Sequence, residues 1–157
     1  MEEYLLEAKE ELKRLEHIIY VSLKYTRTVD VIINALNRMV STFDLIVDAF
    51  MEKAETEGVI ETMPKSPALK ARKLAELYPE DQFLQKYLIF YHFLKRILKN
   101  PHQKRQEYRR HVNLVVDFDN STAEINIDNL VNCERFMHQF LKYAHKVVLG
   151  QEDEDNF

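Results

Sequence analysis

The fold is decided by residues 29–51, which read VDVIINALNRMVSTFDLIVDAFM. Apolar side chains recur there every three or four positions, at Ile32, Leu36, Met39, Phe43, Ile46 and Phe50. This spacing places them along one face and predicts a long amphipathic helix. Thr28 suits the N-cap position, and Asp30 in the first turn suits the positive end of the helix dipole. We expect the helix to end before Gly58.

A second helical pattern precedes this stretch, from about residue 2 to residue 25. Its apolar residues also follow steps of three and four, at Leu5, Ala8, Leu12, Leu15 and Ile19. Each of the two helices would be roughly 36 Å long at 1.5 Å per residue. Because very few residues separate them, they form either an antiparallel hairpin or one kinked helix, and we expect the hairpin.

Two further helices are predicted in the middle of the chain. Ser66 and Pro67 suit the cap and the first position of a helix that runs to Leu77. Another runs from Asp81 to about Asn100, because Pro101 stops it. Apolar side chains cover two faces of this fourth helix, which predicts a central position or contact with a second subunit.

The hydrophobic period changes from helical to alternating near residue 112. Apolar residues occupy every second position in two short runs, one on each side of the turn-forming residues 119–122: Val112, Leu114, Val116, Phe118, Ala123, Ile125 and Ile127. The pattern predicts a β-hairpin over about 112–127 that rests on the bundle, because an isolated hairpin is marginally stable. Asp128 or Asn129 would cap a last helix that ends near Leu149 and is closed by Gly150.

The predicted fold is therefore mainly α, an antiparallel bundle of four to five helices with one small β-hairpin before the last helix. Residues 1–150 would form a single domain, and residues 151–157 an acidic disordered tail. The chain of 157 residues has only two glycines and four prolines, which argues against a turn-rich β-sandwich or a nucleotide-binding α/β fold.

Composition also limits the chemistry. The single cysteine, Cys133, excludes an intramolecular disulfide and a multi-cysteine zinc site, and its apolar setting predicts a buried small hydrophobe. The acidic, amphipathic N-terminus does not have the features of a signal peptide, and no apolar run has the length of a membrane span. We therefore expect a cytoplasmic protein without membrane contact and without a cofactor.

A strongly basic stretch spans residues 95–111, KRILKNPHQKRQEYRRH. It carries +6 while the whole chain carries −4, which leaves −10 for the rest. With three residues of the helix at 67–77, these side chains would form one positive face that attracts phosphate groups: Lys95, Arg96, Lys99, Lys104, Arg109, Arg110, Lys70, Arg72 and Lys73. The alternative is a solvated loop that balances the acidic first helix.

Arg105 and His111 in this stretch are candidate catalytic residues. In a metal-independent ribonuclease a histidine exchanges the proton of the 2′-hydroxyl or the leaving oxygen, and an arginine stabilises the charge that develops at phosphorus. Three interpretations stay open for this pair: catalysis, ligand binding without catalysis, and plain surface.

Other polar residues on the predicted helices are interpreted structurally. Glu134 and His138 lie one turn apart, with His145 two turns further on, so they could share a face and bind a metal. No second helix supplies the matching Glu-x-x-His pair of a di-iron site, so we interpret them as polar side chains on the solvent-facing side of the helix and predict no metal site. Asp44 and Asp48 are expected on the polar face or as hydrogen-bond partners of tyrosines.

The order of these elements resembles the HEPN superfamily of small helical proteins. Two long antiparallel helices are followed by a short helix with Ala71-Arg-Lys-Leu74, and Arg105-Gln-Glu-Tyr-Arg-Arg-His111 fits the Arg-x(4–6)-His motif of the family. The resemblance implies a homodimer. It also implies either metal-independent ribonuclease activity or pairing with a small nucleotidyltransferase. In the family the motif usually enters a helix, whereas here His111 precedes a predicted strand.

We therefore expect a non-catalytic, dimeric binding module whose basic face, about 95–111, contacts nucleic acid or a partner protein. One alternative is a metal-independent ribonuclease that uses Arg105 and His111. The other is a purely structural assembly protein.

Overall fold

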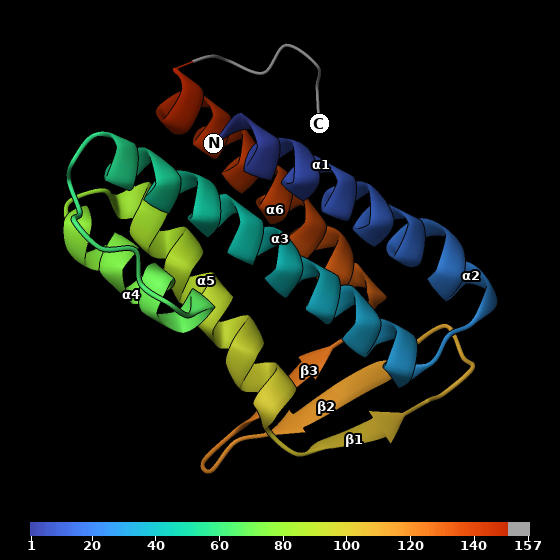
Figure 1. Cartoon of the computed structure of the whole chain (residues 1–157). Helices are drawn as coiled ribbons and strands as arrows, with labels where there is room; N and C mark the ends of the chain where they lie inside the picture. Colours follow the sequence, from blue (N-terminus) through green and yellow to red (C-terminus); the bar gives the residue numbers. More distant parts are fainter. Residues whose placement is uncertain (151–157) are drawn as a thin grey trace.

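The computed structural model describes residues 1–150 as a bundle of helices with a small sheet at one end (Figure 1). The first helical rod comprises α1 (Glu2–His17), a π-helical segment η1 (Ile18–Ser22) and α2 (Leu23–Tyr25). A short turn leads into α3 (Val29–Thr56), which runs antiparallel to the rod. The helical hairpin is confirmed, and η1 is an addition that the apolar spacing did not indicate.

The helix α3 lies at the centre of the bundle, in contact with α1, α4, α5 and α6. All six of its predicted seam residues are buried. The ring of Phe43 lies 5.1–5.9 Å from those of Phe90, Tyr91 and Phe140, which come from the two neighbouring helices. The hydroxyl of Thr28 accepts a hydrogen bond from the Val31 amide at 3.3 Å, as expected of the N-cap.

The remaining helices begin at side-chain caps. The helices α4 (Pro67–Leu77) and α5 (Gln82–Lys99) start at Ser66 and Asp81, as predicted. The last helix, α6 (Ile127–Leu149), starts earlier than expected, because Asn126 rather than Asp128 is its N-cap. Asn126 and Asn129 form a reciprocal capping box. Gly150 closes α6 in the left-handed conformation at φ 68°, where glycine carries no steric penalty.

The sheet has three antiparallel strands in the order β1 (His102–Arg105), β2 (Asn113–Asp117) and β3 (Thr122–Ile125). The strands β2 and β3 form the predicted hairpin. The strand β1 was not expected, because all four of its residues are exposed and polar and show no apolar alternation. Backbone pairing with β2 alone defines this edge strand.

The two faces of the sheet have different environments, because one packs on the helical bundle and the other carries an ion pair. Leu114, Val116 and Ile125 face the bundle and join its core. Val115 points to the opposite face yet is only 2% exposed. An ion pair between Arg105 of β1 and Glu124 of β3, at 3.4 Å, crosses β2 on that face. The two long side chains therefore shield Val115, which explains why an apolar residue interrupts the alternation.

Within residues 1–150, no helix is long and apolar enough to cross a lipid bilayer. Cys133 is half-buried, and its burial raises the pKa of the thiol to about 11, so it is a weak nucleophile. The predicted acidic tail, residues 151–157, lies outside the described residues.

A carboxylate–tyrosine pair joins α3 to α5. The hydroxyl of the fully buried Tyr91 donates a hydrogen bond to Asp44, which confirms the expected tyrosine partner of this aspartate. Burial raises the pKa of the Asp44 carboxyl above its ordinary value, although the hydrogen bond from Tyr91 and the charge of Lys95 act in the opposite direction.

This pair predicts a pH-dependent effect of Asp44→Asn. A carboxyl whose pKa is raised by folding binds its proton more tightly in the folded state, so its contribution to stability falls as pH rises from about 4. We expect the variant to gain stability relative to the wild type between pH 4 and pH 7, measured by urea unfolding at both values. Tyr91→Phe, which leaves Asp44 without its donor, should cost about 1–3 kcal/mol at pH 7. A loss in Asp44→Asn that is equal at both pH values would contradict this explanation.

Candidate nucleic-acid interface

The loop 106–111, between β1 and β2, is fastened to the turn between α2 and α3. A carboxylate oxygen of Glu107 accepts a hydrogen bond from the Val29 amide at 2.9 Å, and the Tyr108 amide donates to the Arg27 carbonyl oxygen at 2.6 Å. Gln106 and Tyr108 adopt positive φ angles of 53° and 63°, which non-glycine residues rarely occupy. The hydrogen bonds compensate for this strained backbone, because they fix the loop against the helical hairpin.

Glu107 is the only acidic residue of the basic stretch, and its carboxylate lies at the positive end of the α3 dipole. The Nζ atom of Lys104 lies at the same end of α3, 3.2 Å from a carboxylate oxygen of Asp30 and 3.9 Å from one of Glu107. The beginning of α3 therefore holds the first part of the loop that carries Arg109, Arg110 and His111.

A cavity of about 430 Å³ opens where this loop meets the start of α6. Its polar lining comes from three separate segments of the chain: Arg27, Gln106, Arg110, His111, Asn113, Asn126 and Asp128. Arg27 is half-buried, whereas Arg110 and His111 are exposed. Among the residues that the structure describes, no carboxylate lies within ion-pair distance of either arginine. The cavity is therefore lined by two arginines that have no carboxylate partner within the described residues.

The lining also offers hydrogen-bond acceptors beside these cations. The side-chain oxygen of Asn113 is buried and makes no hydrogen bond within the described residues. Asp128, in the first turn of α6, places an exposed carboxylate in the same cavity. This arrangement fits a ligand with an anionic group for the arginines and a hydroxyl donor for the acceptors.

The predicted pair of Arg105 and His111 does not line a common cavity. His111 faces the cavity, whereas Arg105 is engaged with Glu124 on the sheet. Arg110 and Arg27 accompany His111 instead. Arg27 lies 84 positions before His111 in the sequence, so motif spacing could not identify it.

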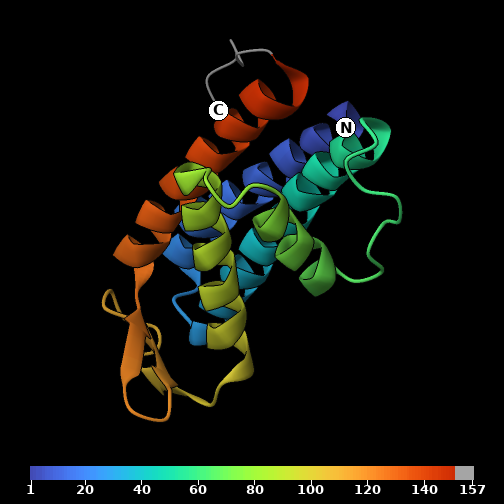
Figure 2. The same ribbon diagram turned by 90° about the vertical axis from the view of Figure 1, so that its left-hand side faces the viewer.

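The predicted basic face is divided into separate groups. The helix α4 packs on α3 and α5, away from the sheet (Figure 2). Lys70 pairs with Asp48 at 2.8 Å, and Lys95 lies over the Tyr91 ring at 4.4 Å. Arg96 covers Phe118 at 4.7 Å. With Lys104, four of the nine predicted cations therefore interact within the chain, and α4 separates its own three from those of the stretch 95–111.

A second, smaller basic group lies between α4 and α5. Burial and the charges of Lys95 and Arg72 lower the pKa of His92, which places these three residues near one another. Lys73 and Lys99, at other positions on the same two helices, have no ion pair among the described residues.

The structure changes the interpretation of Glu134 and His138. Glu134 is only 6% exposed, so its assignment to the surface is wrong. It occupies the buried seam of α6, whose steps of three and four run through Leu130, Glu134, Met137, Leu141, Ala144 and Val148. Cys133 and Val147, each one position earlier than a seam residue, are half-buried and exposed, respectively. Glu16, which the sequence did not single out, completes a cluster with this pair.

Searches of protein-family models, curated proteins and solved structures find no match to this chain.

The fastening of the loop predicts a specific effect of Glu107→Ala. Loss of the acceptor for the Val29 amide should lower the free energy of unfolding by about 1–2 kcal/mol. Amide hydrogen exchange at Val29 and Tyr108 should accelerate, because the loop is released from the helical turn. Glu107→Gln keeps an acceptor oxygen and is the matched control. Unchanged exchange at Val29 in the alanine variant would contradict the proposed anchor.

Proposed function

We propose that the protein is a non-catalytic, HEPN-like RNA-binding module that receives a backbone phosphate in the cavity lined by Arg27, Arg110 and His111. The observation that carries this proposal is the convergence of two arginines without carboxylate partners at one cavity. A guanidinium group binds phosphate through two parallel hydrogen bonds, which gives geometry as well as charge attraction. The N-terminus of α6 adds the positive end of a helix dipole at the same place.

The acceptors in the cavity favour RNA over DNA. The Asp128 carboxylate can accept a hydrogen bond beside the arginines, and the 2′-hydroxyl of ribose supplies a donor next to the phosphate. Deoxyribose lacks this hydroxyl and cannot make that hydrogen bond. The small number of available cations supports contact with one or two phosphates of a single strand rather than with a long duplex.

The surroundings of Arg105 and His111 support binding without catalysis. Arg105 is held by Glu124, and no described side chain hydrogen-bonds to the exposed His111 ring. A general base requires a neighbour that orients its ring and sets the tautomer.

We also propose a cytoplasmic location.

Substitution of cavity arginines should weaken RNA binding selectively. In fluorescence anisotropy with a short labelled single-stranded RNA, Arg110→Ala should raise the dissociation constant about tenfold, or about 1.4 kcal/mol. Arg105→Ala removes the same charge from an exposed ion pair and should change it less than about twofold. The slope of log K against log[salt] should fall in magnitude by about 0.7 in the Arg110 variant.

Equal losses in both arginine variants would contradict the cavity and indicate general charge attraction. Metal-independent RNA cleavage that disappears in His111→Ala would replace the proposal by the ribonuclease. Absence of RNA binding, together with tight binding of a nucleotidyltransferase-type protein, would assign the basic loop to a protein partner.

A homodimer is the second element of the proposal. The apolar residues of α3 are accounted for inside the bundle, whereas α5 leaves Phe83, Ile89 and Phe93 exposed at 67%, 69% and 38%. These side chains offer α5 as the contact between two copies. A monomer at micromolar concentration in size-exclusion chromatography with light scattering would exclude this dimer.

A further inference from the structure

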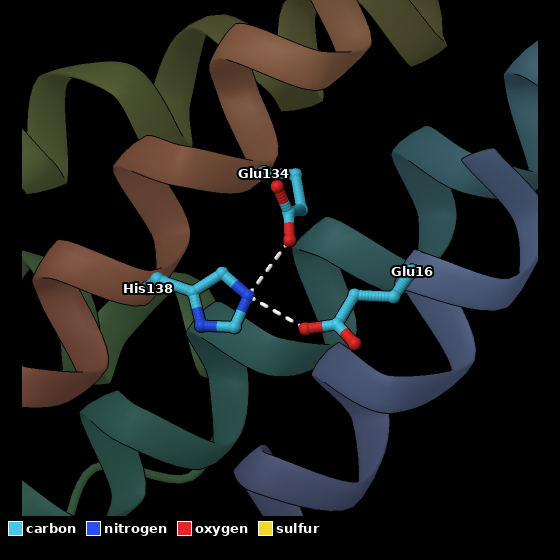
Figure 3. Close-up of side chains that lie close together, drawn as sticks. All are labelled: Glu16, Glu134 and His138. Atoms are coloured by element: carbon cyan, nitrogen blue, oxygen red, sulfur yellow. Dashed lines mark hydrogen bonds and ion pairs between the residues drawn. The ribbon is translucent and has the colours of Figure 1, made fainter. Parts of the chain in front are cut away.

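Three side chains with metal-binding atoms converge between α1 and α6 (Figure 3). The Nε2 atom of His138 lies 2.8 Å from Oε1 of Glu16 and 2.8 Å from Oε1 of Glu134. All three donor atoms lie within 4.8 Å of one another. Glu16 comes from the last turns of α1, and the other two residues lie one turn apart on α6.

The electrostatics of this arrangement call for a cation. One ring nitrogen carries at most one N–H, yet two carboxylate oxygens approach it equally closely. The Glu134 side chain is 8% exposed and that of His138 17%, so solvent screens the negative charge of Glu134 poorly. A metal ion among the three atoms would attract both carboxylates and the lone pair of the imidazole nitrogen.

We propose that Glu16, Glu134 and His138 bind one divalent transition-metal ion of the zinc type, a site separate from the proposed RNA cavity. One imidazole and two carboxylates suit Zn²⁺, whereas Mg²⁺ and Ca²⁺ take oxygen ligands almost exclusively. Glu134 lies six residues after Asp128 of the RNA cavity, about 9 Å along the helix axis at 1.5 Å per residue.

The required geometry is close to the observed one. With Zn–N and Zn–O bonds of about 2.0–2.2 Å, tetrahedral ligands lie about 3.4 Å apart. The two separations of 2.8 Å therefore need to widen by roughly 0.6 Å, which small rotations of the long glutamate side chains supply. The side chain of Glu16 is 39% exposed, so the fourth coordination position faces solvent and would take water.

A second layer of contacts orients the Glu134 ligand. The hydroxyl of Tyr20 donates to its other oxygen, Oε2, at 3.2 Å, which leaves Oε1 directed at the cluster. Such outer contacts are a regular feature of metal sites.

The unusual backbone of the first helix supports the same location. Tyr20 belongs to η1, the π-helical segment that begins two residues after Glu16. Single π-helical turns inside α-helices are rare and occur frequently at functional sites. Here η1 contains Tyr20, whose hydroxyl contacts Glu134, and the segment follows closely on Glu16, the ligand from α1.

Calorimetric titration of the untagged full chain with ZnCl₂ tests the site. We expect one equivalent to bind with a dissociation constant below about 10 µM. Glu134→Gln, His138→Gln and Glu16→Gln should each weaken binding at least about tenfold, and Tyr20→Phe by about three- to tenfold. Glu10→Gln, on the exposed face of α1, and His102→Gln, on the edge strand, are matched controls and should bind as the wild type does.

Two further measurements make the outcome decisive. X-ray absorption of the zinc-loaded chain should show one imidazole among nitrogen and oxygen ligands, and zinc should raise the melting temperature of the wild type but not of Glu16→Gln. Glu16 is the most exposed ligand, so its variant tests the site even if Glu134→Gln does not fold. Absence of saturable binding, binding unaffected by the ligand variants, or a sulfur ligand would overturn the proposal.

Discussion

The first turn of α3 presents amide groups that no residue of the helix can satisfy, and the rest of the architecture near the sheet depends on how they are bonded. Thr28 accepts from one of them locally. Glu107, 78 positions later, accepts from the Val29 amide. This bond ties the loop between β1 and β2 to the central helix of the bundle. Together with Leu114, Val116 and Ile125, which pack the sheet against the core, this bond brings the loop and the start of α6 to one cavity.

Electrostatics then decides which basic residues remain available to a ligand. The chain carries more acidic than basic residues, and several cations of the basic stretch have partners within the fold. Lys104 pairs with Asp30, Arg105 with Glu124, and Lys70 of α4 with Asp48. The charges of Arg27 and Arg110 are not matched in this way. A basic stretch in the sequence is thus reduced to a compact site, to which a residue from the distant α2–α3 turn contributes.

Much of the fold could be predicted from local patterns, because helix seams and caps are local properties. Thr28, Ser66 and Asp81 start their helices as their side chains indicate. The strand β1 could not be predicted, since an exposed edge strand needs backbone partners but no apolar pattern. Glu134 shows the opposite difficulty: it lies on the apolar seam of α6, and a charged residue there breaks the pattern that defines the seam. The partners of His111 and of Glu134 lie on other elements, and only their packing brings them together.

The central claim is that the anchored loop, and not the basic group between α4 and α5, receives RNA. The most direct measurement is a titration of the isotope-labelled full chain with a short single-stranded RNA, followed by the chemical shifts of its backbone amides. The account predicts that the largest shifts fall together on residues 27–29, 106–113 and 126–128. Shifts centred on Arg72, His92 and Lys95, or no shifts at RNA concentrations well above that of the protein, would contradict it.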